Sequence, residues 1–242
     1  MDVLKNNKNL YENYTSNIAI SQNNLSSQII WSKKYFEYHI LPIIPKDKDI
    51  NILELGCGWG KYLHILDLNG YTNVEGVDLS KSQIDEAKSS FDLKNVFCAD
   101  SIEFLTNSKN KYDVIFMFDV LEHLDLDYAI ELGKIIESKL NSNGQFIFQS
   151  PNGMSLFNPI RYADLTHQRS FTVNSSTQYF NMIGFKNFEF RELGSVPHGV
   201  KSTIRKYLWK IISFRIKMFF LVAYGDSMGG IYTANILGIA SK

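Results

Sequence analysis

The sequence predicts an α/β fold: a Rossmann-like, seven-stranded and mostly parallel sheet with helices on both faces and an antiparallel edge. Three observations support this prediction. Short β-branched or aromatic runs alternate with segments of helical spacing, which is typical of βαβ units. A glycine-rich turn separates the first run from the first helix. The last two runs are far apart in the sequence, which indicates an antiparallel edge.

Length and composition fit one large globular domain. The chain has 242 residues, of which 45% are hydrophobic and 21% charged, so it can bury a substantial core. Lys plus Arg and Asp plus Glu each number 25, and a zero net charge gives no general attraction to nucleic acid. With two cysteines, neither a disulfide framework nor a cysteine zinc site is expected.

Neither a signal peptide nor a membrane span is expected. The first residues, MDVLKNNKNL, have no apolar core behind their lysines. The longest apolar run, Met218 to Tyr224, is far shorter than the ~20 residues that a membrane helix needs. These features predict a cytoplasmic protein.

The predicted elements follow the apolar runs and the helical spacing in order. Strands are expected at residues 50–55, 74–77, 96–99, 114–118, 146–148, 185–193 and 230–240. Helices are expected at 28–41, 61–68, 81–90, 102–106 and 126–140. Pro42 ends the first of these helices.

The regular alternation ends after Ser150. Residues 151–171 are polar and without a clear period, and loops of this length are usually functional. Thr172 is positioned to cap a helix at Val173–Met182, and a late helix is expected at 200–222. The predicted organisation is an N-terminal segment with a flanking helix at 1–48, followed by one domain at 49–242.

The sharpest motif is Glu54-Leu-Gly56-Cys-Gly58-Trp-Gly60, which ends the strand at 50–55 and leads into the helix at 61–68. Glycine allows a tight turn and lets a ligand approach where a Cβ would clash. A dinucleotide fingerprint would need glycine at position 61, which is Lys61, and the chain has no Gly-Lys-Ser/Thr sequence of a P-loop. Glu54 adds a hydrogen-bond acceptor to the same crevice.

Two carboxylates follow the next strands. Asp78 ends the second strand and can accept both hydroxyls of a ribose, while Asp100 follows the third and can accept from an adenine amino group. Either Asp alone is more typical of a helix cap. Ligands of open α/β sheets bind at the carboxyl ends of the strands, however, and three such ends carry these groups.

Taken in order, the motifs resemble those of class I S-adenosylmethionine-dependent methyltransferases. The resemblance covers roughly residues 50–150 and continues more weakly to the end. It rests on Glu54-x-Gly56-x-Gly58-x-Gly60, Asp78, Asp100-Ser101 and Phe118-Asp119-Val-Leu-Glu122-His123.

The resemblance implies S-adenosylmethionine as the cofactor. Gly56, Gly58 and Gly60 would pass under its methionine part, and Asp78 would hold its ribose. Asp119 would lie near the methyl-bearing end. The other implied cofactor residues are Glu54, Leu79, Asp100, Ser101 and Phe118.

His123 and His167 are the candidate catalytic residues, because the pKa of histidine lies near working pH. One helical turn would set Asp119 and His123 toward the same crevice. In similar methyltransferases, a His at this offset holds or deprotonates the acceptor. The alternative is a His that only ties the turn together, and Glu122 is expected to be structural.

The run Asp-x-Thr-His…Phe-Thr at 164–172 resembles a segment of methyltransferases from bacterial surface-polysaccharide (capsule or O-antigen) clusters. Arg161, Asp164 and Arg169 could bind a sugar or a phosphate there. Alternatively, the loop pairs its own charges. No metal is expected, because Asp164 and His167 alone are too few ligands.

The N-terminal leader and the late helix supply the remaining predictions. Leaders of this superfamily often form a lid, so Tyr14 is a further candidate for substrate binding. The late segment has six basic residues and no acidic one, with an apolar stripe that includes Ile211 and Ile212. Such a helix can lie on an anionic membrane. Packing on the core or on a second subunit is favoured, because the final strand must return across it to the sheet.

The sequence therefore predicts a methyltransferase that O-methylates a surface-glycan building block, at a sugar hydroxyl or a phosphate-type group. The alternatives are N-methylation of an amino sugar or small amine, and a non-catalytic subunit that binds S-adenosylmethionine. The expected partner is a small-molecule or glycan-linked acceptor, with no nucleic acid, and the chain is expected to be a monomer or homodimer.

Overall fold

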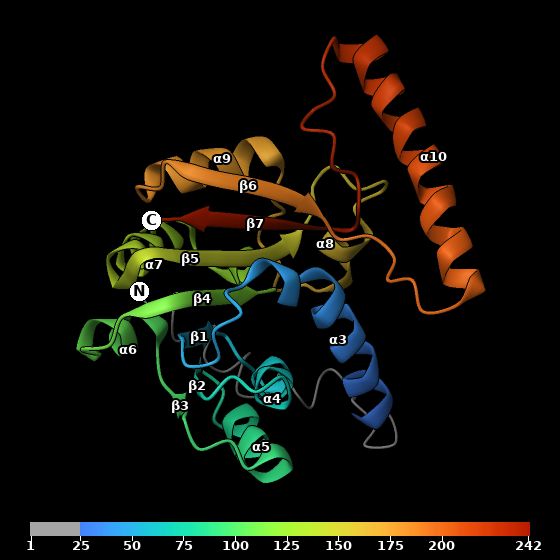
Figure 1. Cartoon of the computed structure of the whole chain (residues 1–242). Coiled ribbons are helices and arrows are strands. Elements are labelled where there is room, and N and C mark those ends of the chain that lie inside the picture. The colour runs from blue at the N-terminus through green and yellow to red at the C-terminus, as the bar shows by residue number, and fades with distance from the viewer. Residues whose placement is uncertain (1–24) are drawn as a thin grey trace. The chain divides into compact units, whose positions relative to one another are not determined.

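The computed structural model describes residues 25–242 and contains the predicted sheet. Its seven strands are ordered β3-β2-β1-β4-β5-β7-β6 (Figure 1). The pairs β1–β2, β1–β4 and β2–β3 are parallel, while β7 runs antiparallel to both β5 and β6. The predicted fold class is therefore confirmed, including the antiparallel edge.

The observed elements are as follows. The strands are β1 (Asn51–Leu55), β2 (Asn73–Asp78), β3 (Val96–Cys98), β4 (Tyr112–Phe118), β5 (Leu140–Pro151), β6 (Asn187–Glu192) and β7 (Asn235–Ser241). The helices are α3 (Leu25–His39), α4 (Lys61–Leu68), α5 (Lys81–Phe91), α6 (Ser101–Asn107), α7 (Leu126–Lys139), α8 (Pro159–Ala163), α9 (Val173–Met182) and α10 (Val200–Tyr224). Short 3₁₀ helices are η2 (Leu41–Ile43) and η3 (Leu121–His123).

Elements with strong local signals have the predicted bounds. Helix α9 begins after Thr172, whose side chain accepts from the Ser175 backbone while Ser175 bonds back to Thr172, a capping box. The clearest differences in bounds are in the loop at 151–171, in β5 and in β7, which begins at Asn235 rather than at residue 230. The loop at 151–171 contains the short helix α8, and β5 is longer than predicted because its pairing with β7 extends it to Pro151.

The chain divides into two compact units. The first comprises residues 1–117 with 139–142, and the second comprises 118–138 with 143–242. In the first unit, the Phe36 ring of α3 stacks on Tyr62 of α4, with centroids 5.4 Å apart, and meets Phe116 of β4 edge-on at 6.0 Å. These contacts fix the helix that follows the glycine motif, and so they position the loop that carries it.

An aromatic cluster forms the core of the second unit. The Phe180 ring of α9 packs against Phe146 and Phe148 of β5 and against Phe185, with centroids 5.4 to 6.1 Å apart. Helix α9 is also tied to α7, because the Tyr179 hydroxyl donates to the Ala129 carbonyl at 3.0 Å. This core supports the loop between β5 and α9.

Helix α10 differs from the prediction made for it. Ile211 and Ile212 are 59% and 46% exposed, so the expectation that the apolar stripe packs on the core of this chain is wrong. Only Ser202 and Ile216 are buried. The last strand returns to the sheet without being covered by this helix, because residues 225–234 form the connection. In residues 25–242, no helix is long and apolar enough to cross a membrane.

Candidate functional site

The glycine loop of the first unit is built from backbone groups. It follows β1, and the Gly56 and Cys57 N–H groups donate to the Val77 carbonyl of β2, at 2.7 and 3.0 Å. Gly58 and Gly60 both have left-handed backbones, with φ of 53° and 76°. Gly60 is the N-cap of α4 and offers no side-chain cap to that helix.

Asp78 is fixed beside this loop by two backbone donors. Its Oδ2 accepts from Gly58 N–H and its Oδ1 from Ser80 N–H, both at 2.8 Å. Burial raises the pKa of Asp78, and the two hydrogen bonds partly oppose that shift. Each carboxylate oxygen keeps a further lone pair, which is what a pair of ribose hydroxyls would use.

Glu54 is the most perturbed group of the first unit. Its side chain is 2% exposed, and burial raises its pKa to about 8, with Lys61 lowering it and Asp78 raising it further. Its Oε2 is buried and has no hydrogen-bond partner among the described residues. A buried carboxylate that lacks a donor favours a cationic ligand beside it.

These residues fit S-adenosylmethionine, whose methionine part carries an ammonium and a sulfonium cation. Glu54 and the loop would hold that part, and Asp78 would hold the ribose. Gln83 Oε1, a second buried acceptor without a described partner, lies 3.5 Å from where a Cβ on Gly58 would stand. The loop therefore leaves polar groups ready for a ligand at its surface.

The other predicted cofactor residues are placed as follows. Asp100 is the N-cap of α6 and accepts from Ile102 and Glu103 N–H, at 2.9 and 3.1 Å, as its alternative interpretation predicted. Ser101 begins α6, and Leu79 is exposed directly after β2. Their assignment to adenine recognition stays a prediction.

In the second unit, β4 ends in a strained turn. Phe118 is buried, and Asp119 has a left-handed backbone with φ of 56°. Gln149 of β5 holds this turn, because its carbonyl accepts from Asp119 N–H and its Nε2 donates to both Asp119 oxygens at 2.9 Å. The expected helical turn between Asp119 and His123 is wrong, because η3 begins only at Leu121.

The loop before α9 is held against η3 by hydrogen bonds that main-chain carbonyls of η3 and of Leu124 accept. The Glu122 carbonyl accepts from Gln168 N–H at 2.8 Å, and the His123 carbonyl accepts from Gln168 Nε2 at 2.8 Å. Arg169 donates to the Leu124 carbonyl. These bonds bring His167 next to His123, and their ring centroids are 4.6 Å apart; the catalytic role expected of both stays a prediction.

His123 is oriented by a short hydrogen-bond chain. Its Nδ1 lies 2.8 Å from Thr166 Oγ1, and Thr166 Oγ1 donates to Asp164 Oδ1 at 2.6 Å. A hydroxyl has one hydrogen, so Thr166 must accept from His123 Nδ1–H. The tautomer of His123 is thereby set, with its lone pair on Nε2.

The same histidine is neutral at physiological pH. Burial lowers the pKa of His123 to about 4, the nearby His167 lowers it as well, and Asp164 opposes the shift. A neutral imidazole with its lone pair on Nε2 can accept a proton, but a pKa of about 4 makes it a weaker base than an ordinary histidine. Proton transfer therefore depends on Asp164 stabilising the imidazolium through Thr166.

Glu122 and His167 lie next to His123. Glu122 is fully buried, and its Oε2 accepts from Ser150 Oγ at 3.1 Å. Its Oε1 has no hydrogen-bond partner among the described residues and lies 3.9 Å from His167 Nε2. His167 Nδ1 lies 3.0 Å from the Ile160 carbonyl, so Nδ1 carries a hydrogen. Burial and the Asp119 charge raise the pKa of Glu122 well above its usual value.

These three side chains could hold a metal ion. Within residues 25–242, one ligand atom each of Glu122, His123 and His167 lies within 4.8 Å of the others. Glu122 was expected to be structural, and its carboxylate lies 3.9 Å from His167 Nε2, so its role stays a prediction. Two imidazoles and a carboxylate are a donor set that suits a divalent transition metal. Asp164, the ligand considered from the sequence, instead bonds Thr166.

The predicted substrate residues have different surroundings. Arg161 donates to the Gln168 carbonyl at 2.9 Å and so holds the loop's own backbone, while Arg169 donates to the Leu124 carbonyl after η3 and ties the loop to that turn. Their role in substrate binding stays a prediction. Tyr14 lies outside the described residues.

One feature of the site was missed from the sequence. Thr166 was not recognised as the link between Asp164 and His123, although the spacing Asp-x-Thr is a signal for a side chain that bonds two residues ahead.

A glycine loop beside the buried Glu54 and the half-buried Asp78, at the carboxyl ends of parallel strands, is typical of α/β proteins that bind a nucleoside-bearing cofactor. The comparisons with known proteins specify that class. Residues 34–189 match the sequence profile of a family described as "Methyltransferase domain". The chain belongs to this family and is an S-adenosylmethionine-dependent methyltransferase.

Named relatives match short stretches. "Ubiquinone biosynthesis O-methyltransferase" of Rickettsia bellii is 33% identical over 96 residues, 38% of this chain and 39% of the relative. The protein of that name from Coxiella burnetii is 37% identical over 81 residues, 32% of this chain and 34% of the relative. The matched stretches thus span about a third to two fifths of these relatives' length.

Solved structures share the fold. A SAM dependent methyltransferase from Archaeoglobus fulgidus has a TM-score of 0.66 at 22% identity, over 88% of this chain and 94% of that one. The plantazolicin methyltransferase BamL, solved in complex with a substrate analogue and SAH, has a TM-score of 0.55 at 15% identity, over 98% and 90% of the two chains. At these identities, the likeness concerns the fold alone.

Proposed function

We propose that this methyltransferase transfers the methyl group to a hydroxyl oxygen of a small acceptor, and that His123 takes the hydroxyl proton. The observation that carries the proposal is the hydrogen-bond chain from His123 through Thr166 to Asp164, which leaves the basic lone pair on Nε2. A hydroxyl acceptor must lose a proton during transfer, so an oriented neutral base is useful to O-methylation.

The cofactor and the two histidines have separate roles in the proposed reaction. Bound S-adenosylmethionine supplies an electrophilic methyl group on a sulfonium sulfur. His123 accepts the acceptor's proton at Nε2. The imidazolium that forms donates from Nδ1 to the Thr166 hydroxyl, which donates to Asp164, so the Asp164 charge stabilises it. His167 lies beside this ring and would orient the acceptor. Positioning supplies much of the rate in such an in-line displacement.

The relatives' names support oxygen as the methylated atom. Both matched proteins are called O-methyltransferases, which favours a hydroxyl over an amine. Two hydroxyl classes deserve a direct comparison: a phenol, by analogy with those relatives, and the sugar hydroxyl that the surface-polysaccharide resemblance implies. For a sugar, we propose that Arg161 and Arg169 contribute their remaining N–H donors.

The test is a transfer assay with radiolabelled S-adenosylmethionine against phenols, sugar nucleotides and amines. We expect a hydroxyl product, and we expect His123→Ala to lower kcat about 10²–10³-fold with an unchanged cofactor Kd. Thr166→Val should lower kcat about tenfold or more, while Thr166→Ser, which keeps the hydroxyl, should remain near wild type.

A chelation experiment distinguishes proton transfer by His123 alone from metal binding by the same residues. If His123 acts as the base alone, exhaustive chelation leaves kcat unchanged. If Glu122, His123 and His167 hold an ion, chelation abolishes activity and a divalent metal restores it, and Glu122→Gln then lowers metal affinity. N-methylation as the dominant activity, or wild-type turnover by both His123→Ala and His167→Ala, would contradict the proposal.

A further inference from the structure

Helix α10 exposes most of its surface. Of its 25 residues only Ser202 and Ile216 are buried, and with Trp209, Ser213 and Phe220 they form a narrow stripe that faces the rest of the second unit. Phe220 anchors the helix by stacking on Tyr232, with centroids 5.7 Å apart and an interplanar angle of 6°. The opposite side of the helix is available to a partner.

That opposite side is apolar along its whole length. Its stripe has the alternating spacing of four and three that keeps side chains on one helical face, and roughly 33 Å separate its ends. The members are 42% to 85% exposed: Val200, Ile204, Tyr207, Ile211, Phe214, Met218 and Val222. Exposed apolar side chains that are contiguous over this length indicate an interaction surface.

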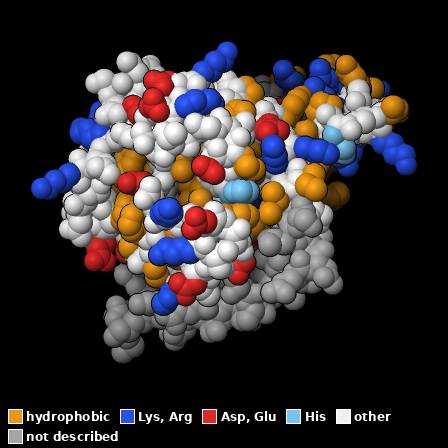
Figure 2. Space-filling view, turned by 60° about the horizontal axis from the view of Figure 1, so that its bottom comes forward, with side chains coloured by type: hydrophobic (Ala, Val, Ile, Leu, Met, Phe, Trp, Pro, Cys, Tyr) orange, Lys and Arg blue, Asp and Glu red, His pale blue; other side chains and the backbone are white. Residues whose placement is uncertain are grey.

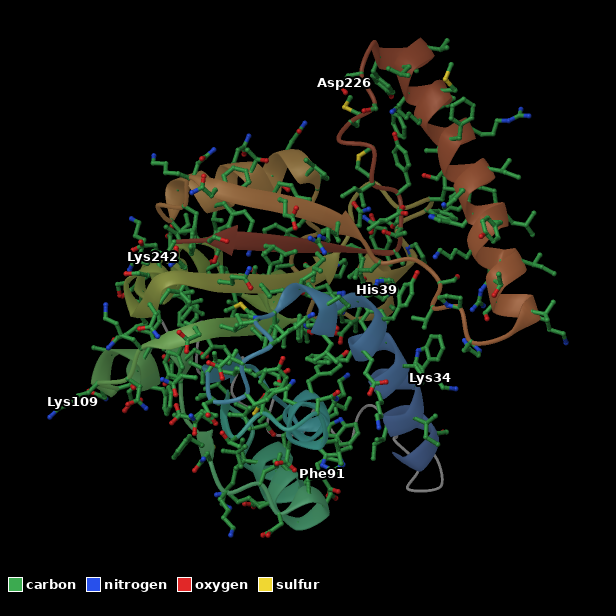
Figure 3. The ribbon with its side chains drawn as sticks, viewed as in Figure 1. Lys34, His39, Phe91, Lys109, Asp226 and Lys242 are labelled. Carbon is green, nitrogen blue, oxygen red and sulfur yellow. The ribbon has the colours of Figure 1, made fainter. Side chains whose placement is uncertain are left out.

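Basic side chains line both edges of the apolar stripe. At 100° per residue, Lys201, Arg205 and Arg215 fall on one edge, and the half-buried Lys206 falls with Lys210 and Lys217 on the other. The first edge also carries exposed apolar side chains: Leu208, Ile212 and Phe219. No acidic residue occurs between Glu192 and Asp226. Asp226 lies beyond the C-terminal end of α10 (Figure 3). Figure 2 shows hydrophobic and basic side chains together at the right of the view, where α10 lies.

We propose that α10 docks this enzyme on an anionic lipid surface, with its axis in the plane of the headgroups. The apolar stripe would enter the boundary of the acyl chains, and the two basic edges would reach lipid phosphates on either side. This arrangement of an apolar face between two basic edges is what an interfacial helix requires.

Charge complementarity favours lipid over a second copy of the chain. In a two-fold dimer through α10, the same stripe and its six basic residues would meet themselves, with no acidic side chain on the helix to offset the repulsion. An anionic bilayer offers both apolar depth and negative charge along the full length of the helix.

The experiment is co-sedimentation of the full chain with vesicles of phosphatidylglycerol and phosphatidylcholine, at about 0.05 M and about 0.5 M salt. We expect binding at low salt, loss at high salt, and none to vesicles of phosphatidylcholine alone. Replacing Arg205, Lys210 and Lys217 by Gln should weaken partitioning about 100-fold, since each charge contributes about fivefold. Ile211→Gln with Phe214→Gln should weaken it at least about tenfold.

A matched control replaces three exposed lysines elsewhere, Lys94, Lys109 and Lys134, by Gln, and it should bind like the wild type. All variants should keep their S-adenosylmethionine affinity and melting temperature, because every changed side chain is exposed. Equal binding by the charge variant and its control would overturn the proposal. So would a failure of the wild type to bind anionic vesicles, or a lipid-free dimer that Ile211→Gln with Phe214→Gln converts to a monomer.

Discussion

The glycine loop of the first unit and the histidine site of the second are built in opposite ways. In the loop, main-chain hydrogen bonds and positive φ angles set the shape of the binding surface, and Asp78, Glu54 and Gln83 add side-chain groups beside it. In the histidine site, side chains from η3 and the loop before α9 assemble around His123, at distances of 2.6 to 2.8 Å along the chain to Asp164.

This difference has a physical consequence. A site made of backbone depends on which residues can adopt its conformation, so it is sensitive to an added Cβ. A site made of side chains depends on which atoms carry protons, so it is sensitive to pH and to the loss of a single hydroxyl. The two kinds of perturbation should therefore separate the two regions.

The largest effect is expected from Gly60→Val. A Cβ at this left-handed position would stand 2.5 Å from Leu93 Cδ1 and 3.1 Å from Ala87 Cβ. The clash and the backbone strain together should lower the free energy of unfolding by about 3 kcal/mol or more. Gly70→Val is the control, because it is left-handed too but has nothing within 4 Å, and it should lose about 1–2 kcal/mol. Urea unfolding measures both, and equal losses would show that packing around Gly60 is unimportant.

Acid should destabilise the histidine site. The pKa of His123 falls from 6.5 to about 4 on folding, so between these values the unfolded chain binds a proton that the folded one does not. The free energy of unfolding is then lost as pH falls from about 6.5 to about 4, by about 2–3 kcal/mol. The raised pKa of Glu54 gives the opposite slope.

The His123 contribution is isolated by comparing chelator-treated wild type with His123→Gln in urea at several pH values. The difference between the two proteins should narrow as pH falls through this window. A difference that does not change with pH would mean that His123 keeps an ordinary pKa in the folded chain.

Asp78→Ala should weaken cofactor binding, and it also removes the acceptor of the Gly58 and Ser80 N–H groups. If the carboxylate accepts two ribose hydrogen bonds, the variant should weaken S-adenosylmethionine binding by about 1.5–3 kcal/mol, measured by calorimetry. Asp164→Ala, in the second unit, should leave that affinity unchanged while lowering kcat. Unchanged affinity in Asp78→Ala would remove Asp78 from the cofactor site.

The smallest expected effect is the release of a proton from Glu54 when S-adenosylmethionine binds. With a pKa of about 8, Glu54 is mostly neutral at pH 7, and a cationic ligand favours its ionised form. Cofactor affinity should therefore rise up to about tenfold between pH 6.5 and 8, with net proton release. Calorimetry in two buffers of different ionisation enthalpy measures the release, which Glu54→Gln should abolish. Release that persists in this variant would assign the proton to another group.

Much of the fold could be predicted from the sequence because its signals are local. Glycine spacing fixed the loop between β1 and α4, and Thr172 fixed the start of α9. Contacts between distant residues could not be predicted in this way. Thr166 meets His123 only because Gln168 and Arg169 bind the carbonyls of η3 and its following residue, which places the loop on that turn.

Helix α10 also shows what a sequence pattern cannot predict. Its amphipathic pattern was correctly predicted as a helix at 200–222, but an apolar stripe does not say what covers it. The sequence favoured packing on the core or on a second subunit, and the structure exposes Ile211 and Ile212 in this chain, which excludes only the core of this chain. The inner stripe at Ser202, Ile216 and Phe220 is narrower and less apolar than the outer one, so composition alone favoured the wrong face.

The exposure of α10 also sets its local stability. A helix that buries two of its 25 side chains, and whose N-cap Gly199 gives no side-chain cap, gains little from tertiary packing. Its backbone hydrogen bonds should therefore open without unfolding the sheet, and its amide hydrogens should exchange early in deuterium oxide. Any surface that covers the outer stripe would slow this exchange, so the exchange rate along α10 reports the fraction of time that the helix is covered.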